Sequence, residues 1–187
     1  MKKLLIVVDM INGFINEGNL HDKEIKSIAP KCAEHIERFI AEGQDIVAFC
    51  DNHNHDSKEF TAFPSHCLSG STESELIDEL ATYRADMDII AKNSTNGFFA
   101  PGFQNYLVKL NDYEEILLVG CCTDICVLQL ALSLKAYCNE NDYDCKIVVD
   151  EAACETFEIP GHNRQEYNEM AKKLMINSGI EVIEVIL

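Results

Sequence analysis

Strand-length runs of apolar residues recur along the chain, and they restrict the fold more than any other feature. Several of these runs are rich in β-branched residues and do not alternate with polar residues. This pattern is typical of strands that are buried on both faces of a parallel sheet. Six runs carry it: residues 4–8, 46–50, 89–91, 116–119, 147–149 and 182–186.

Amphipathic helical patterns lie between these runs. They cover residues 28–41, 74–83, 103–110, 124–138 and 164–178. The alternation of strand and helix implies right-handed crossovers. We therefore predict one domain, residues 1–187, with a three-layer α/β/α doubly wound fold around a mainly parallel six-stranded sheet. In such folds, ligands bind beyond the carboxyl ends of the strands.

Acidic residues strongly outnumber basic ones. The chain has 32 Asp and Glu against 15 Lys and Arg, a formal net charge of −17 at pH 7. This balance disfavours nucleic acid and anionic membrane surfaces as partners. No apolar stretch is long enough to span a bilayer, and the first run is too short for a secretory signal. We expect a cytoplasmic protein, and the composition does not distinguish a monomer from a homo-oligomer.

The nine cysteines favour reduced thiols over disulfides. Their number is odd, and several lie in apolar segments. Both features fit a reducing compartment better than a small secreted scaffold. We interpret Cys32, Cys50, Cys138 and Cys145 as small core residues.

Polar residues stand where the predicted strands end. Asp9, Asp51 and Lys92 each follow or close an apolar run, and Cys126 begins the helical pattern after the fourth run. A helix N-terminus favours a thiolate. With Asp9 as base and Lys92 as supporting cation, Cys126 could act as a nucleophile in acyl transfer. The residues alone leave open that Cys126 is another core cysteine and that Asp9 is a strand-end cap.

A second group of polar residues follows the second strand. Residues 51–66 concentrate imidazoles and carboxylates, which are ligands that Zn²⁺, Fe²⁺ or Mn²⁺ accept. These residues are Asp51, His53, His55, Asp56, Glu59 and His66. Two histidines and an aspartate would leave positions for water or substrate, as in an open metal site. A solvated polar loop without metal is an equally good interpretation of these residues.

The segment after Lys92 holds two adjacent aromatic residues, Phe98 and Phe99, between Gly97 and Gly102. Such a segment could be a mobile wall that closes over a flat substrate. It could equally be a hydrophobic plug for the core.

Three motifs, in order along the chain, resemble a known family. They are Val7-Val8-Asp9 followed by Phe14, Ile89-Ile90-Ala91-Lys92, and Gly-x-x-Thr-Asp-x-Cys at residues 120–126. The chain resembles the isochorismatase-like cysteine hydrolases over nearly its whole length, and among them the nicotinamidases or pyrazinamidases most. Ile125 stands where several nicotinamidases have a histidine.

The resemblance implies a set of roles. Asp9, Lys92 and Cys126 would be catalytic, and a cis peptide before Cys122 would aim the amides of Cys122 and Cys126 at the substrate as an oxyanion hole. The further implied roles are metal binding by Asp51, His53 and His66, with Glu59 as in some nicotinamidases, and substrate binding by Phe14, Phe63 and Phe98.

The implied activity is that of a metal-dependent cysteine amidohydrolase in NAD salvage. It would hydrolyse nicotinamide to nicotinate and ammonia through a thioester on Cys126. A related amidase that acts on another small amide or an N-carbamoyl compound is one alternative, and such relatives generally lack the Asp-x-His ligands. A catalytically inactive metal-binding or interaction protein on the same fold is a second. Cleavage of a vinyl ether, as in isochorismatases, is a third.

Overall fold

Six parallel strands form one sheet at the centre of the protein. The computed structural model describes residues 2–184. The strand order is β3-β2-β1-β4-β5-β6, and each neighbouring pair is parallel. The strands are β1 (Lys2–Val8), β2 (Asp45–Asp51), β3 (Asp88–Lys92), β4 (Tyr113–Cys121), β5 (Lys146–Glu155) and β6 (Glu181–Ile183). The predicted six-stranded doubly wound sheet is confirmed.

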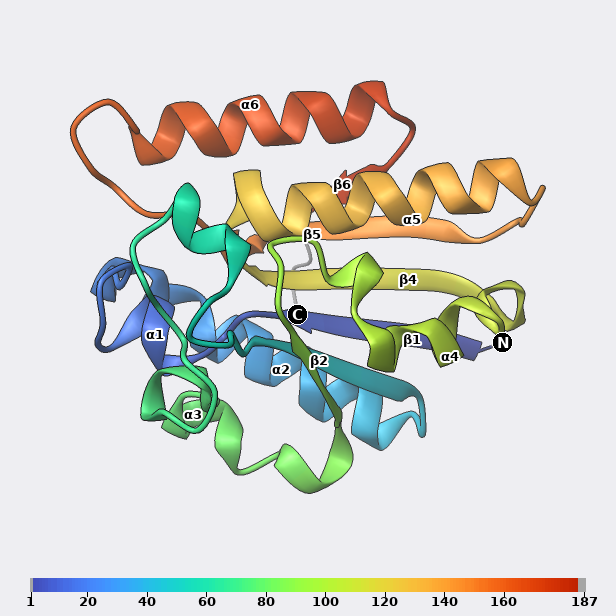
Figure 1. Ribbon diagram of the computed structural model, residues 1–187. Helices are drawn as coiled ribbons and strands as arrows, with labels where there is room; N and C mark the ends of the chain where they lie inside the picture. The colour runs from blue at the N-terminus through green and yellow to red at the C-terminus, as the bar shows by residue number, and fades with distance from the viewer. Residues whose placement is uncertain (1, 185–187) are drawn as a thin grey trace.

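Helices cover both faces of this sheet (Figure 1). The α-helices are α1 (Asn12–Ile15), α2 (Ala29–Ala41), α3 (Asp78–Ala81), α4 (Gln104–Leu107), α5 (Leu128–Glu140) and α6 (Arg164–Asn177). Short 3₁₀ turns lie at Lys23–Ile28, Lys58–Thr61, Thr72–Ser74, Arg84–Asp86, Gly97–Phe99, Pro101–Phe103 and Leu110–Asp112, and a π-helical turn lies at Thr123–Val127.

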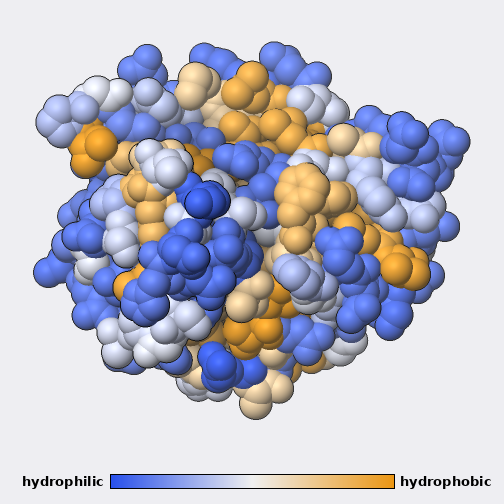
Figure 2. Space-filling model, in the orientation of Figure 1, coloured by the Kyte–Doolittle hydropathy of each residue, from blue (hydrophilic) through white to orange (hydrophobic). Residues whose placement is uncertain are grey.

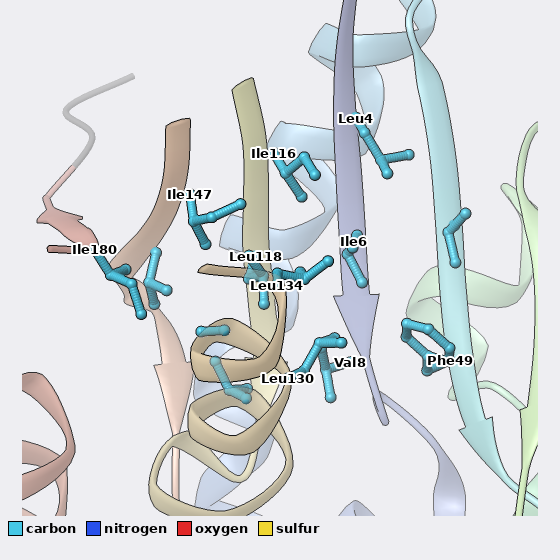
Figure 3. Packing of buried hydrophobic residues seen from close by; sticks show 14 of the residues in the cluster. Leu4, Ile6, Val8, Phe49, Ile116, Leu118, Leu130, Leu134, Ile147 and Ile180 are labelled. Carbon is cyan, nitrogen blue, oxygen red and sulfur yellow. The ribbon is translucent and has the colours of Figure 1, made fainter. Parts of the chain in front are cut away.

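Alternate residues of β1 face two separate hydrophobic cores, because successive side chains of a strand point to opposite sides. Leu4, Ile6 and Val8 belong to the core beneath α4, α5 and α6, and Figure 3 shows Ile6 near Leu134 and Val8 near Leu130 of α5. The core on the other face lies beneath α2. The unbroken apolar run of β1 is therefore explained by burial on both sides.

Two predicted helices are shorter than their patterns. The pattern at 74–83 gives only a 3₁₀ turn and the single-turn α3, because Leu76 pairs with Ile11 and the Ile77 amide donates to the Met10 carbonyl. This extended segment is tied to the chain that follows β1, so the apolar residues there serve a pairing rather than a helix. The pattern at 103–110 gives only α4. Of the last predicted strand, residues 185 and 186 lie outside the described part of the chain.

The carboxyl ends of the central strands meet at one edge of the sheet. Asp51 is the register partner of Lys92, and Val8 is the partner of both Phe49 and Gly120. Gly120 has a φ of +116°, and a Cβ there would lie 2.1 Å from the Val8 carbonyl oxygen, so no other residue fits. The close approach brings the turn after β4 against the end of β1.

Hydrophilic residues cover much of the face shown in Figure 2, with smaller hydrophobic areas between them. Among the described residues, no helix has both the length and the apolar character needed to cross a membrane. All nine cysteines are free thiols and all are buried, including the four interpreted as core residues.

Candidate active site

Lys92 is the centre of a buried charged cluster at the carboxyl edge of the sheet. Its Nζ lies 2.8 Å from Oδ2 of Asp9 and donates a hydrogen bond to Oδ1 of Asp51. The Sγ of Cys126 is 4.0 Å from the same nitrogen. All four side chains are buried, with Lys92 only 1% exposed. The three predicted catalytic residues are therefore together in space.

The backbone fixes Asp9 at the end of β1. Asp9 has a left-handed conformation, with φ of +51°, which aspartate tolerates better than most residues. Its amide donates to the Phe49 carbonyl at 3.0 Å, and its Oδ1 accepts a hydrogen bond from the Asp51 amide at 3.1 Å. Asp9 is thus held from the side of β2 while its second oxygen faces Lys92.

The pKa values of the two carboxylates beside Lys92 are shifted in opposite directions. Burial raises the pKa of Asp9 to about 7, although the Lys92 charge and hydrogen bonds with Lys92 and Cys126 act to lower it. Burial also acts to raise the pKa of Asp51, but the charge of Lys92 beside it holds that pKa well below its usual range. Asp9 is therefore suited to exchange a proton near neutral pH, and Asp51 stays ionised.

Burial opposes the thiolate that the position of Cys126 near a helix start favours. It lies in the π-helical turn Thr123–Val127, before α5 begins at Leu128. Burial raises the pKa of the Cys126 thiol well above its usual value, although the Lys92 charge acts to lower it. The desolvation of a fully buried sulfur outweighs the nearby cation. The thiol proton must therefore be transferred when the sulfur attacks.

Four potential metal ligands gather beside this cluster. Asp51, His53, Glu59 and His66 each offer an atom within 4.8 Å of the others. Nε2 of His53 lies 3.5 Å from Oδ2 of Asp51 and 3.9 Å from Oε1 of Glu59, and Nε2 of His66 lies 3.7 Å from Oδ2 of Asp51. Asp51 therefore belongs to both clusters, with one oxygen toward Lys92 and the other toward the histidines.

The two histidines are oriented as metal ligands. Nδ1 of His53 is 3.2 Å from Oδ1 of Asn93, and Nδ1 of His66 is 2.8 Å from the Pro64 carbonyl oxygen. With Nδ1 as the donor in both rings, Nε2 keeps its lone pair for a cation. The buried Nε2 of His53 makes no hydrogen bond of normal geometry to any described residue. This set of donors fits a divalent metal ion.

A cavity of about 760 Å³ opens onto both clusters. Cys126 and Cys122 line it on one side, and three of the metal ligands, Asp51, Glu59 and His66, line it on another. The two aromatic residues Phe14 and Phe63 also line it, with ring centroids 5.7 and 6.2 Å from that of His66. A flat ring placed between them would lie next to the metal ligands and the nucleophile.

Phe98 was predicted to bind substrate, but it does not line this cavity. Its ring packs on the hydrophobic core beside α5, 5.6 Å from the ring of Tyr137. The Gly97 position explains this placement, since a Cβ there would lie 3.0 Å from the Phe49 ring. Within the segment after Lys92, Phe98 packs against the core, Phe99 is exposed, and Thr95 lines the cavity.

The peptide between Cys121 and Cys122 is cis, as the resemblance implied. The Cys121 thiol donates to the Asp9 carbonyl at 3.1 Å, which joins this turn to the end of β1. The assignment of the Cys122 and Cys126 amides to an oxyanion hole stays a prediction.

Part of the cavity wall was not predicted from the sequence. Leu20, Phe157, Ile159 and Arg164 also line the cavity. Phe157 and Ile159 lie between β5 and α6, and Arg164 begins α6. The available signal was the presence of Phe157 and Ile159 in an otherwise polar loop around Gly161. Nothing in their spacing relates them to Cys126, because they approach it only through the fold.

Comparisons with known proteins agree with this geometry. Nicotinamidase 1 of Arabidopsis thaliana is 31% identical over 175 residues, which are 84% of this chain and 71% of the relative. The crystal structure of nicotinamidase PncA from Bacillus subtilis has a TM-score of 0.82 and 28% identity, covering 98% of this chain and 100% of that one. Pyrazinamidase of Pyrococcus horikoshii, solved in complex with zinc, has a TM-score of 0.79 and 25% identity, covering 99% and 100%.

The family comparison covers almost the whole chain. The model of the isochorismatase domain matches residues 3–185. This range includes all six strands, the Lys92 cluster and the four potential metal ligands. The chain therefore belongs to the isochorismatase family.

Proposed function

We propose that this protein is a metal-dependent nicotinamidase, which hydrolyses nicotinamide to nicotinate and ammonia. Its relatives are amidohydrolases that act on linear amide bonds, and this chain is a hydrolase of the same class. The substrate assignment rests on Asp51, because this residue belongs both to the cluster of the nucleophile and to the set of potential metal ligands. One carboxylate joins the nucleophile's cluster to a set of metal ligands, and both face one cavity.

Asp51, His53 and His66 would hold the metal, with Glu59 beside them. The donor set suits Zn²⁺, Fe²⁺ or Mn²⁺. When bound, the metal would supply a Lewis acid for the nitrogen of a pyridine ring. Phe14 and Phe63 would contact the faces and edge of that ring, which positions the carboxamide carbon near Cys126.

The chemistry begins with proton transfer from the Cys126 thiol to Asp9. The sulfur attacks the amide carbon, and the amides of Cys122 and Cys126 would stabilise the developing oxyanion. Asp9 then gives the proton to the leaving nitrogen, so that ammonia departs and a thioester remains. Water attacks the thioester, Asp9 accepts a proton from the water, and the released thiol recovers it as nicotinate leaves.

Lys92 would hold this arrangement together. Its charge keeps two buried carboxylates next to one another, with Nζ 2.8 Å from Asp9 and in contact with Asp51. Burial acts to lower the pKa of Lys92, but the charges of Asp51 and Asp9 raise it well above its usual value. Lys92 therefore acts as a permanent cation and does not compete with Asp9 for the thiol proton.

The product nicotinate would enter NAD salvage, and we assign the reaction to the cytoplasm.

Ammonia release from nicotinamide is the direct test, with wild-type protein of measured metal content and with Cys126→Ala. We expect release by the wild type alone, with turnover in Cys126→Ala lower by about 10⁴-fold or more. Cys145→Ala, at the amino end of β5, is the matched control for the loss of a buried thiol.

Turnover by Cys126→Ala near the wild-type rate would contradict the proposed nucleophile. If the wild type binds metal but releases no ammonia, nicotinamide is not the substrate, and the same assay with other small amides or N-carbamoyl compounds comes next. A protein without turnover of any of these and without a reactive Cys126 would be an inactive member of the family.

A further inference from the structure

The outer wall of the cavity is a loop that joins β5 to α6. It comprises residues 156–163, and Phe157, Glu158 and Ile159 from it line the cavity. This wall is not part of the catalytic cluster. Its position nevertheless decides how much space lies between the cavity mouth and Cys126.

The wall is bonded to the turn that carries the nucleophile. Asp124 lies two residues before Cys126, and both of its carboxylate oxygens accept hydrogen bonds from the wall. Oδ1 accepts from Oγ1 of Thr156 at 2.5 Å, and Oδ2 lies 2.9 Å from Nε2 of His162. The two bonds come from the two ends of the loop, so Asp124 closes it.

His162 holds the inner part of the loop as well. Its Nδ1 lies 3.0 Å from the Phe157 carbonyl oxygen. Its ring stacks on Phe157, with centroids 3.9 Å apart and planes inclined by 10°, and on Tyr167 of α6 on the other side at 3.7 Å. His162 therefore connects the nucleophile turn, the cavity-lining Phe157 and the first turns of α6.

A second set of contacts joins the wall to Asp22, which also lines the cavity. Nη2 of Arg164 lies 2.6 Å from Oδ2 of Asp22, and its Nε donates to the Thr156 carbonyl at 2.8 Å. The amide of Glu158 donates to the same Asp22 oxygen at 2.9 Å. These contacts do not reach Asp124, so the side-chain hydrogen bonds between the wall and the nucleophile turn come from His162 and Thr156.

We propose that His162 is a positioning residue that sets the size of amide admitted to Cys126. Through Asp124 and Phe157 it holds the wall at a fixed distance from the nucleophile turn. The proposal rests on the proposed function in one respect, namely that the substrate reacts at Cys126. The residue does not take part in the chemistry, because its contacts are with Asp124, Phe157 and Tyr167 rather than with the Lys92 cluster.

Loss of the imidazole should affect binding more than turnover. In His162→Ala, Phe157 loses its stacking partner and the contact between its carbonyl oxygen and Nδ1, and the wall is free to move outward. We expect the KM for nicotinamide to rise about tenfold, while kcat stays within about threefold, because uniform binding is lost and the reacting groups are intact. His162→Gln keeps a side-chain donor for Asp124 and should recover part of the KM.

A second readout does not depend on nicotinamide. Alkylation of Cys126 by iodoacetamide and by the bulkier N-phenylmaleimide can be followed by mass spectrometry of the Cys126 peptide. In His162→Ala, the ratio of the bulky to the small reagent's rate should rise about fivefold, the effect of one lost hydrogen bond. His35→Ala is the matched control, since His35 is fully buried and lies 2.6 Å from Asp150 in a second His–Asp pair.

The control separates a structural role from a positioning role. His35→Ala should lower the unfolding temperature without changing the alkylation ratio, because α2 and the Asp150 region do not line the cavity. The proposal is overturned if His162→Ala unfolds at a lower temperature but keeps the wild-type KM and alkylation ratio. If the wild type does not hydrolyse nicotinamide and the alkylation ratio still shifts, the proposed function fails and this inference stands.

Thr156→Val covers the case in which His162→Ala does not fold. It removes the other hydrogen bond to Asp124 and keeps the shape of the side chain. The ratio should then rise in the same direction by about twofold to threefold, since one neutral donor is lost. A wild-type ratio in Thr156→Val would overturn the proposed link between the wall and the nucleophile turn.

Discussion

The Lys92 cluster and the cluster of potential metal ligands lie side by side, yet only in the first do the charged groups pair with one another at short range. Around Lys92, one cation lies between the carboxylates of Asp9 and Asp51, and the strands place all three. In the second cluster, the Nε2 atoms of His53 and His66 converge on carboxylate oxygens at 3.5 to 3.9 Å, too far apart for hydrogen bonds of normal length. The first cluster is an ion pair made by the fold, whereas the second is a set of donors that fits a divalent cation.

The difference follows from which part of the chain builds each cluster. Asp9 follows β1 and Lys92 ends β3, the two parallel strands on either side of β2, and the register of the sheet fixes both residues. His53, Glu59 and His66 come from the loop after β2, which has little regular structure to position it. Metal binding would therefore stabilise this loop, and the catalytic cluster should persist without it.

Asp51→Asn should have the largest effect, because Asp51 is the one residue in both clusters. The amide cannot balance the charge of Lys92, and it is a poorer ligand for a divalent cation. We expect stoichiometric metal to be lost and kcat/KM to fall by about 10³-fold, and breaking a buried ion pair costs about 3–5 kcal/mol of stability. Metal analysis, ammonia release and thermal unfolding measure the three effects.

Asp45→Asn provides a control at the opposite end of the same strand. Asp45 begins β2 and lies 2.8 Å from Nζ of Lys2 in an exposed ion pair. Its replacement should leave metal content and turnover unchanged. If Asp51→Asn loses only metal and keeps a wild-type unfolding temperature, Asp51 does not stabilise the Lys92 cluster. The claim that this residue serves both clusters would then be wrong.

His53→Ala should separate the clusters. We expect loss of bound metal and a rise in KM of about 10²-fold or more, because ligand removal abolishes the open site. The alkylation rate of Cys126 by iodoacetamide should stay within about twofold of wild type, since the Lys92 cluster needs no metal. His55→Ala, an exposed histidine two residues away, is the control. A large drop in the alkylation rate of His53→Ala would show that the metal-ligand loop also supports the nucleophile.

Sequence periodicity was enough to predict the part of the molecule that the strands build. Asp9 and Lys92 could be placed because their strands are continuous apolar runs with a charge at the end. The failures lie where tertiary contacts decide the outcome. The segment around Leu76 has a helical pattern but pairs with Ile11, and Phe98 belongs to the core although the chain around it has the composition of a lid.

The acidity of Cys126 could not be predicted from its place in the chain for a related reason. A helix start favours a thiolate, but the burial that opposes it depends on residues from several elements. The cavity wall at 156–163 shows the same limit, because the bond between His162 and Asp124 joins residues 38 positions apart. Such contacts leave no local pattern to detect.

The pH dependence of the reaction should follow Asp9. Burial raises its pKa to about 7, and the proposed base must be ionised to accept the thiol proton. We therefore expect kcat/KM to fall as pH drops through about 7, by about tenfold for each further unit. The pKa of Asp51 is held well below its usual range, so its ionisation should not contribute in this interval.

Alkylation of Cys126 in metal-free protein gives an independent pH profile. Loss of the thiol proton is needed there as well, so the same fall near pH 7 should appear without metal or substrate. A fall in kcat/KM that follows metal content instead, with a flat alkylation profile, would place the titrating group in the metal-ligand cluster.

Asn93→Ala should have the smallest effect. It tests whether a neighbouring side chain orients a ligand of the metal-ligand cluster. Oδ1 of Asn93 lies 3.2 Å from Nδ1 of His53 and is the side-chain acceptor that orients this ring. Without it the ring can rotate, and we expect metal affinity to weaken by about tenfold, the lower end of the range for such supporting residues. Competition with a chelator of known affinity measures the change directly, and saturating metal should restore kcat. An unchanged affinity would mean that the loop orients His53 by packing alone, so that the metal-ligand cluster would be as firmly built by the protein as the cluster around Lys92.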